Sequence, residues 1–393
     1  MAESIKHPQS KKHPMYQRVI NFDPYIDHKS LFLLGPRQAG KSTLLRQRFP
    51  KAQYIDLLNT DVFRTLLSTP EQLRERVSPG ELVIIDEIQK LPTLLNEVQW
   101  LIDNKDCRFL LTGSSARKLK RGNANLLGGR ALFFHLYPLT SHEIGYDNLS
   151  RLLEVGGLPG IVDSPIAWEE LKAYVGAYLR EEIQAEALTR SIENFSRFLD
   201  IAIHFNAEQI NYTKIGNDAE VPPRTIKDYV KILEDTLIIH VLPPFKRGSR
   251  RKTASMEKIY FFDIGVAHAM ARRQSIQPGT PEYGKTFEHF VFLELQAAKE
   301  YQRKEVALSF WRTHSNLEVD FIVDDRIAIE VKGTGKVSSQ DTKPLLALDE
   351  EIKLERKIIV CNEKAYRTTE TGIEIMPISL FCEQLWEEDL LGG

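Results

Sequence analysis

Gly35-Pro36-Arg37-Gln38-Ala39-Gly40-Lys41-Ser42 is the stretch that decides the fold of the N-terminal part of this 393-residue chain. It matches the pattern G-x-x-x-x-G-K-[ST] at every fixed position. An apolar run at residues 31–34 precedes it, and a helical pattern at residues 43–48 follows it. Strand, glycine-rich loop and helix in this order predict a phosphate-binding loop, because glycines let backbone N–H groups approach phosphate oxygens. A chance glycine-rich turn is the alternative, and it is uncommon in this context.

We expect this loop to bind ATP together with Mg²⁺. Lys41 should reach the β- and γ-phosphates, and the hydroxyl of Ser42 should ligate the metal ion. Thr43, the next residue, belongs to the same expected nucleotide-binding set.

Two adjacent carboxylates follow a second apolar run, in Glu81-Leu82-Val83-Ile84-Ile85-Asp86-Glu87. Asp86 is predicted to hold the metal ion through its water shell, and Glu87 to polarise the attacking water. A solvated acidic turn is a weaker interpretation, because four apolar residues deliver the pair to the end of a strand, where open α/β sheets bind ligands. Ser114 or Ser115, after another apolar run, is a candidate sensor of the γ-phosphate; a helix N-cap is an equally good interpretation.

The sequence between residues 30 and 136 alternates short apolar runs with helical patterns. This alternation predicts an α/β fold with parallel strands and crossover helices. The expected strands are Ser30–Leu34 and residues 54–57, 82–85, 109–112 and 131–136.

Bulk composition sets limits on the function. The length predicts roughly two or three domains, and a formal net charge of -2 gives no general attraction to nucleic acid. The polar N-terminus lacks the apolar core of a signal peptide, and no apolar run approaches the ~20 residues of a membrane span. Three widely spaced cysteines suit a reducing compartment. We therefore expect a cytoplasmic protein with no membrane partner.

These motifs resemble those of the AAA-type ATPases. The local motifs look like those of one bacterial and archaeal family, which joins an AAA ATPase to a C-terminal domain of unknown function. These motifs are Gly-Pro-Arg-Gln-x-Gly-Lys-Ser/Thr, Asp-Glu-Ile-Gln, Thr-Gly-Ser-Ser, and Gly-Gly-Arg followed by Leu-Tyr-Pro-Leu. The resemblance implies ATP hydrolysis and a homo-oligomer, with a hexameric ring as one form. In such ATPases an arginine of a neighbouring subunit often completes the site, and Arg130 is the candidate. An arginine that neutralises the sheet edge is the alternative.

A winged helix is predicted in the middle of the chain. Residues 208–219 and 223–235 have helical patterns, residues 237–242 form an apolar strand, and a basic loop follows. Arg224 and Lys227 should lie on the exposed face of the second helix. The expected wing contributes Lys246, Arg247, Arg250, Arg251 and Lys252. These cations predict salt-sensitive DNA binding. A winged helix that packs against protein is the alternative, because the second helix also carries acidic residues.

The C-terminal part contains a predicted hairpin, residues 317–332, turning at Asp325. If the hairpin is symmetric about that residue, Asp320 faces Glu330, with Cβ atoms ~5 Å apart, and like charges there are destabilising. A metal ion between them would remove this penalty, and Lys332 would lie beside the metal-bound water.

An aspartate followed after nine residues by Glu-x-Lys, here Asp320, Glu330 and Lys332, is a recognisable spacing. It resembles the active-site pattern of the restriction-endonuclease-like fold, found also in Holliday junction resolvases. The resemblance extends to the preceding helical segment, where Glu288 matches an additional metal ligand, and it departs from the usual pattern in having Val319 before the aspartate. It implies a metal-dependent nuclease. The alternative is a domain that keeps the nuclease-like fold but does not cut DNA, and instead binds DNA or packs in an assembly.

The expected architecture is an AAA-type core (residues 1–140), a helical lid (141–200), a winged helix (201–258) and a restriction-endonuclease-like domain (259–393). The favoured function is an ATPase coupled to DNA binding or processing, including nuclease or branched-DNA motor activity. The rival is a nucleotide-dependent molecular switch or scaffold whose inactive nuclease-like domain recognises a protein partner.

Overall fold

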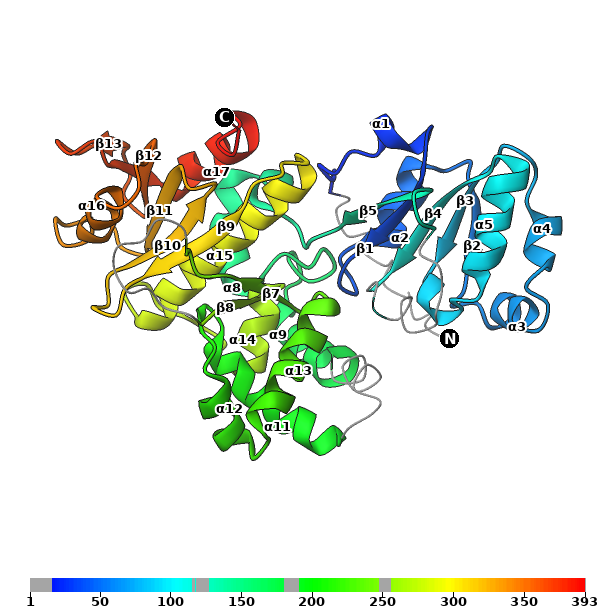
Figure 1. The fold of residues 1–393 in the computed structure, drawn as a ribbon, viewed down its shortest axis with the longest axis horizontal. Coiled ribbons are helices and arrows are strands. Elements are labelled where there is room, and N and C mark those ends of the chain that lie inside the picture. The colour runs from blue at the N-terminus through cyan, green and yellow to red at the C-terminus, as the bar shows by residue number, and fades with distance from the viewer. Residues whose placement is uncertain (1–15, 115–116, 118–126, 180–190, 247–255, 393) are drawn as a thin grey trace, which may run out of the picture.

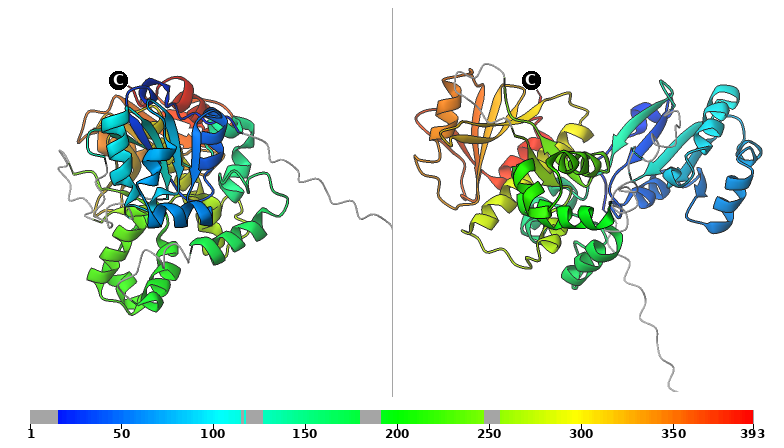
Figure 2. Two further views of the ribbon diagram at one scale, coloured as in Figure 1. Left: turned by 90° about the vertical axis from the view of Figure 1, so that its right-hand side faces the viewer. Right: turned by 60° about the horizontal axis from the view of Figure 1, so that its bottom comes forward.

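A computed structural model describes residues 16–114, 117, 127–179, 191–246 and 256–392 of the chain. It contains a parallel sheet near the N-terminus, a middle part with a small sheet, and a mixed sheet near the C-terminus (Figure 1). The helices of the middle part lie to one side of the line that joins the two larger sheets (Figures 1 and 2). In the described part, no helix combines the length and the apolar character of a membrane span.

The N-terminal sheet has the strand order β2-β3-β4-β1-β5, and all its neighbours are parallel. Its strands are β1 Ser30–Leu34, β2 Gln53–Asp56, β3 Leu82–Asp86, β4 Arg108–Gly113 and β5 Ala131–His135. The associated helices are α1 Asp23–Ile26, α2 Lys41–Arg48, α3 Thr60–Ser68, α4 Gln72–Arg76, the short 3-10 helix η1 Ile88–Lys90 and α5 Leu94–Lys105. The α/β prediction with five parallel strands is thus confirmed, with bounds shifted by a residue at most.

Burial on both faces explains why these strands are continuously apolar. Phe32 of β1 packs with α3 to α5 on one face, whereas Leu33 packs with α2 on the other. Parallel strands covered on both sides have this composition. The second face also receives Ala297 and Tyr301, from a helix of the C-terminal part. The two ends of the chain therefore share a core.

The helical part after the first sheet contains α7 Ser141–Ile144, η2 Tyr146–Asn148, α8 Leu149–Val155, α9 Ala167–Ala173 and the π-helix η3 Tyr174–Leu179. Helix α14, Ile264–Met270, packs against α8 and α9 from much later in the chain. Gly265 makes this approach possible, because a Cβ atom there would lie 1.9 Å from the carbonyl oxygen of Val155. The described helices of the predicted lid therefore pack against a segment from much later in the chain.

The middle part joins three helices to a three-stranded antiparallel sheet of order β6-β8-β7. Its elements are α11 Ile192–Ala202, η4 Ile203–Phe205, β6 Glu208–Gln209, α12 Tyr212–Ala219, α13 Pro223–Asp235, β7 Ile239–Leu242 and β8 Lys258–Phe261. The helix expected to begin at residue 208 begins at Tyr212, because the side chain of Asn211 caps it and β6 precedes it. The predicted boundary between residues 258 and 259 falls inside β8.

The C-terminal sheet has the order β13-β14-β12-β11-β10-β9. Its elements are α15 Pro281–Tyr301, β9 Leu308–Arg312, β10 Glu318–Val323, β11 Ile327–Lys332, α16 Lys343–Asp349, β12 Arg356–Cys361, β13 Arg367–Thr368, β14 Glu374–Pro377 and α17 Ile378–Glu387. In the β10–β11 hairpin Phe321 pairs with Ile329, and Val323 with Ile327. This register confirms the predicted symmetry about Asp325.

Candidate active site

The glycine-rich loop links β1 to α2 by a path that only glycine permits at two positions. A Cβ atom on Gly35 would lie 2.3 Å from the carbonyl oxygen of Leu136, so the backbones are in close contact. Gly40 precedes α2 with a φ of 95°, a conformation that side chains disfavour. The loop therefore places the first turn of α2, with its unpaired N–H groups, at the carboxyl edge of the sheet.

Lys41 is the first residue of α2 and is 5% exposed. Its ammonium group donates to the carbonyl oxygens of Gly35 at 2.7 Å and Pro36 at 2.9 Å. The lysine side chain is thus folded back onto the carbonyl oxygens of its own loop.

Asp86 lies at the end of β3, only 2% exposed. One of its oxygens accepts a hydrogen bond from the hydroxyl of Thr112 on β4, and the other accepts from the hydroxyl of Tyr54 on β2. Burial and the neighbouring carboxylate raise the pKa of Tyr54 to about 12, so the phenol remains a donor. Asp86 is therefore positioned by both strands that flank it.

Thr112 also joins Asp86 to Glu87, since its oxygen accepts from the backbone N–H of Glu87 at 3.0 Å. Glu87 has a φ of 61°, in the left-handed region that is costly for residues other than glycine. The side-chain amide of Gln89 donates to the Glu87 carboxylate. Sequence reasoning missed the roles of Tyr54, Thr112 and Gln89. Thr112 and Gln89 stand in the Thr-Gly-Ser-Ser and Asp-Glu-Ile-Gln motifs, so a signal was available for those two.

These elements surround a cleft of about 660 Å³. Its lining comprises Arg37, Gln38, Gly40, Lys41, Ser42, Thr43, Leu58, Glu87, Gln89, Lys90, Pro159 and Gly160. Most of the predicted loop residues and Glu87 are thus brought together, and the helical part contributes one wall through Pro159. Asp86 and Ser114 are buried and do not line the cleft; Ser115 is outside the described residues.

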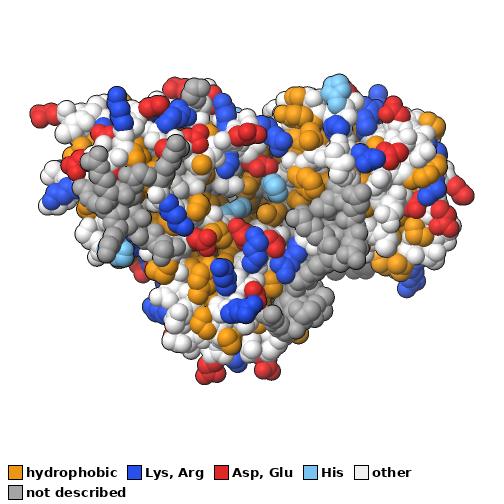
Figure 3. Space-filling view, viewed as in Figure 1, with side chains coloured by type: hydrophobic (Ala, Val, Ile, Leu, Met, Phe, Trp, Pro, Cys, Tyr) orange, Lys and Arg blue, Asp and Glu red, His pale blue; other side chains and the backbone are white. Residues whose placement is uncertain are grey.

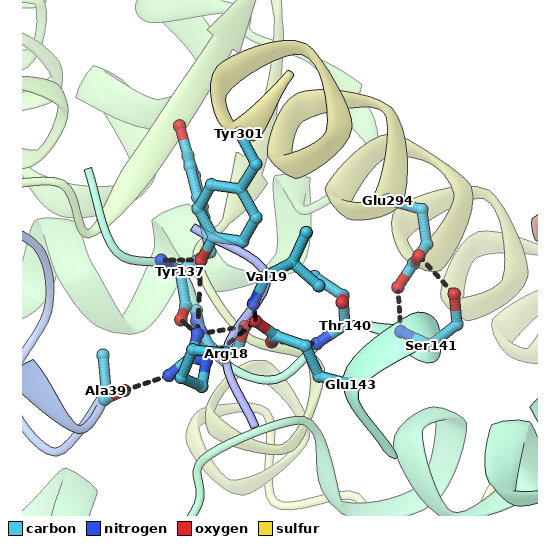
Figure 4. A network of polar contacts seen from close by, with 10 residues as sticks. Arg18, Val19, Ala39, Tyr137, Thr140, Ser141, Glu143, Glu294 and Tyr301 are labelled. Carbon is cyan, nitrogen blue, oxygen red and sulfur yellow. Dashed lines mark hydrogen bonds and ion pairs between the residues drawn. The ribbon is translucent and has the colours of Figure 1, made fainter. Parts of the chain in front are cut away.

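Arg18 connects this loop to three other parts of the molecule (Figure 4). Its guanidinium donates to the carbonyl oxygens of Ala39 at 2.7 Å and Tyr137 at 2.6 Å. It pairs with the fully buried carboxylate of Glu143 near the start of the helical part, at 2.9 Å. It also donates to the hydroxyl of Tyr301 on α15, at 3.2 Å. The glycine-rich loop is thereby tied to the C-terminal part.

Arg130 lies immediately before β5, at the end of the sheet where strands β1 and β5 begin. Its carbonyl oxygen accepts a hydrogen bond from the backbone N–H of Ser30. Its guanidinium forms a two-pronged ion pair with Asp103, at 2.7 and 3.0 Å. The glycine-rich loop follows the carboxyl end of β1, at the opposite end of the strands, so Arg130 is not brought into the cleft of its own chain.

The predicted DNA-contact residues are only partly described. Arg224 and Lys227 are exposed on α13, and Lys246 is exposed after β7. Figure 3 shows Lys and Arg side chains gathered over the middle part, with acidic side chains among them. Arg247, Arg250, Arg251 and Lys252 lie outside the described residues.

The C-terminal hairpin brings together the acidic residues predicted to bind a metal ion, but it also receives Lys258 from β8. The Lys258 ammonium lies 2.9 Å from Glu288, 2.5 Å from Glu318 and 3.6 Å from Asp320. Lys332 pairs with Glu330, and the second Asp320 oxygen accepts from the N–H of Val331 at 2.8 Å.

This arrangement differs from the metal site that was expected at Glu288, Asp320 and Glu330. A lysine ammonium supplies the positive charge that the metal ion was expected to supply. In the part of the chain that is described, no group of three His, Cys, Asp or Glu side chains is arranged for metal binding. The symmetric hairpin predicts that Asp320 lies near Glu330. Lys258 is distant in sequence, and no local pattern predicts its contact with these carboxylates.

Three protein-family models match successive parts of the chain. Residues 27–145 match a family model described as an AAA domain. Residues 146–277 and 283–381 match two families described as domains of unknown function (DUF8612 and DUF4143). The boundary near residue 280 follows the end of the segment that contains β8 and α14.

The chain is also similar to proteins without an assigned function. An uncharacterized protein of Mycobacterium tuberculosis is 27% identical over 307 residues, which cover 75% of this chain and 67% of that protein. An uncharacterized protein of Haemophilus influenzae is 23% identical over 379 residues, 87% of this chain and 91% of that one.

Solved structures give weak matches. The Orc1 protein of Aeropyrum pernix in complex with DNA matches with a TM-score of 0.29 and 13% identity, over 62% of this chain and 86% of that one. A signal transduction ATPase with numerous domains from Pyrococcus horikoshii matches with a TM-score of 0.20 and 15% identity, over 70% of this chain and 47% of that one. Residues 27–145 are therefore similar to an AAA domain, and residues 146–277 and 283–381 are similar to two domains of unknown function.

Proposed function

We propose that the chain is an ATPase whose nucleotide site is the cleft between the glycine-rich loop, Glu87 and the Pro159 turn. The observation that carries this proposal is the arrangement of Lys41, Asp86, Thr112 and Glu87 at one edge of a parallel sheet. That edge is where sheets of this type bind ligands.

Each side chain has a part in hydrolysis that follows from its contacts. The Lys41 ammonium would exchange its two carbonyl partners for phosphate oxygens, while the N–H groups of the loop and of the first turn of α2 surround the phosphates. Glu87 would accept a hydrogen bond from the attacking water, and Gln89 would hold the Glu87 carboxylate in place.

The residues present also fit a magnesium ion bound with the nucleotide. Ser42 lines the cleft, and Asp86, whose oxygens already accept bonds from two hydroxyls, would meet the ion through water. Such an ion would neutralise charge on the phosphates.

Two substitutions test the proposal. Lys41→Ala should lose ATP binding, because the loop loses the ammonium group that would bind the phosphate oxygens. Glu87→Gln should keep binding and lose turnover, because the amide cannot polarise water as a carboxylate does. Nucleotide binding by calorimetry and phosphate release should be measured on both. Turnover by Glu87→Gln at the parent rate would remove Glu87 from the mechanism.

We further propose that the middle part is a winged helix that brings DNA to the ATPase. Its order α11-β6-α12-α13-β7-loop-β8, with an antiparallel sheet, is the order expected of such a unit, and exposed Arg224 and Lys227 on α13 would face the phosphates. Cleavage of DNA is not included, because Lys258 occupies the acidic cluster.

The test of this second proposal is ATP turnover with branched, single-stranded and duplex DNA at two salt concentrations. Stimulation that weakens with salt, and weakens further in Arg224→Ala/Lys227→Ala, is the expected result. A matched control is Lys172→Ala, which removes an exposed helical lysine paired with Glu169 in the preceding helical part. Turnover indifferent to every form of DNA would favour a nucleotide-dependent switch that recognises a protein partner.

A further inference from the structure

The acidic cluster of the C-terminal sheet is formed by Glu288 of α15, Glu318 and Asp320 of β10, and Glu330 of β11. Asp320 and Glu330 are 7% and 3% exposed. Carboxylates removed from water in this way need positive charge close by. The cation that reaches three of them, Lys258, belongs to another sheet.

Lys258 is the first residue of β8 and is 2% exposed. Its backbone pairs with Gln209 and Leu242 in the sheet of the middle part. Its side chain crosses to the C-terminal part, where the ammonium contacts Glu288 and Glu318 and passes 5.3 Å from the centre of the Phe310 ring. The hydroxyl of Tyr260, two residues along the same strand, donates to the same Glu288 oxygen at 2.6 Å. Two residues of β8 are therefore committed to this contact.

Two further cations, Arg312 and Lys332, pair with the cluster from within the C-terminal sheet. Arg312 of β9 pairs with the second oxygen of Glu318 at 3.0 Å, and Lys332 pairs with Glu330. The other Glu330 oxygen has no hydrogen-bond partner among the described residues. The cluster accordingly combines four carboxylates with three cationic side chains.

We propose that Lys258 is the resident cation of this cluster: it fastens β8 of the middle part to the C-terminal sheet and excludes a divalent metal ion from the carboxylates. An ammonium and a divalent ion compete for the same oxygens and repel each other at contact distance. The ammonium has the advantage because its strand is already held by β6 and β7, so little freedom is lost when it docks.

The proposal requires that a metal site emerges only when the ammonium is removed. The full-length chain, free of nucleotide, should be titrated with Mn²⁺ in a calorimeter, and its melting temperature recorded with and without the ion. Parent protein should show no Mn²⁺-dependent rise in melting temperature, whereas Lys258→Met should show one. The rise should be absent from Lys258→Met/Asp320→Asn, which isolates the cluster from other Mn²⁺ sites.

Lys304→Met is the matched control, because Lys304 also pairs with a carboxylate of the C-terminal part, Asp389 at 2.7 Å, but at the surface. It should behave like the parent. A Mn²⁺ effect in the parent that Asp320→Asn abolishes would overturn the proposal, since metal and Lys258 would then coexist. So would the absence of any Mn²⁺ effect in folded Lys258→Met.

A coupling measurement covers the case in which Lys258→Met does not fold. Removing one partner of a buried ion pair leaves uncompensated charge, so a second substitution that removes a facing carboxylate should restore stability. Lys258→Met/Glu288→Gln should therefore fold and melt at a higher temperature than Lys258→Met. A double variant no more stable than the single one would contradict the assigned role. The ATPase proposal is unaffected either way, because Lys41 and Glu87 belong to a different domain.

Discussion

Thr112 shows how one hydroxyl can position the proposed catalytic pair, Asp86 and Glu87. It donates to Asp86 and accepts from the backbone of Glu87, so a single side chain on β4 sets the position of both acidic residues that end β3. The strained backbone of Glu87 is maintained by this bond and by the amide of Gln89.

Thr112→Val keeps the shape of the side chain and removes the hydroxyl, and we expect it to slow ATP turnover without abolishing ATP binding. A hydrogen bond to a charged group contributes about 1.5–3 kcal/mol, which corresponds to roughly a 10- to 160-fold loss of kcat if the bond contributes fully in the transition state. Thr112→Ser retains the hydroxyl and is the control. Equal activities of the valine and serine variants, measured at saturating ATP, would show that the bond is dispensable.

At the scale of elements, Arg18 links the glycine-rich loop, the start of the helical part and α15 (Figure 4). Removing it leaves the buried Glu143 without its cation, a change that costs about 3–5 kcal/mol in comparable pairs. Arg18→Met should therefore lower the melting temperature and also raise the KM for ATP, because Ala39 loses its tether. Arg48→Met, which removes a partly exposed pair with Asp23 at 2.8 Å, is the control and should change neither. A normal KM in folded Arg18→Met would limit Arg18 to a structural role.

Glu294 of α15 joins α7 to α17: it accepts from the backbone and hydroxyl of Ser141, at 2.9 and 2.5 Å, and from the indole of Trp386 at 2.7 Å. Burial raises the pKa of this carboxyl to about 7. The folded state then holds a proton that the unfolded chain, with a pKa near 4.5, has already released. Stability contributed by this group must therefore fall as pH rises from about 4.5 to 7.

Glu294→Gln removes this titration while keeping an acceptor for Ser141. The free energy of unfolding of the parent, minus that of the variant, should decrease between pH 5 and pH 7.5, by up to about 3 kcal/mol. Urea denaturation at several pH values measures the difference. A difference that stays constant with pH, or increases, would mean that Glu294 is already ionised when folded.

The sequence predicted local structure well where a single element contains the pattern. The five parallel strands, the loop around Gly40 and the hairpin symmetric about Asp325 were all foreseen, because periodicity and turn residues act over a few positions. Contacts between distant elements were not foreseen. Lys258 reaches Glu318 across 60 positions, and Arg18 reaches Tyr301 across 283. Neither residue has a local sequence signature, because lysine and arginine are common in strands and N-terminal segments that make no such contact.

At the scale of the whole molecule, the position of Arg130 bears on assembly. It stands at the start of β5, while the glycine-rich loop follows the far end of β1, and a five-residue strand spans ~16 Å. Within one chain Arg130 is thus directed away from the nucleotide cleft, where it pairs with Asp103. If it acts on ATP at all, it must do so on the ATP of a neighbouring subunit.

This geometry leads to a mixing experiment. Arg130→Ala should bind ATP normally and lose a large part of its turnover, and Lys41→Ala should not bind ATP. When the two inactive proteins are mixed, some interfaces pair an intact loop with an intact Arg130, so part of the activity should return. Asp103→Asn is the control, since it releases Arg130 without removing it and should remain active. The mass of the ATP-bound assembly, measured by light scattering, must exceed that of one chain. A strictly monomeric protein with full turnover, or a mixture as inactive as its components, would show that the ion pair with Asp103 is the whole role of Arg130.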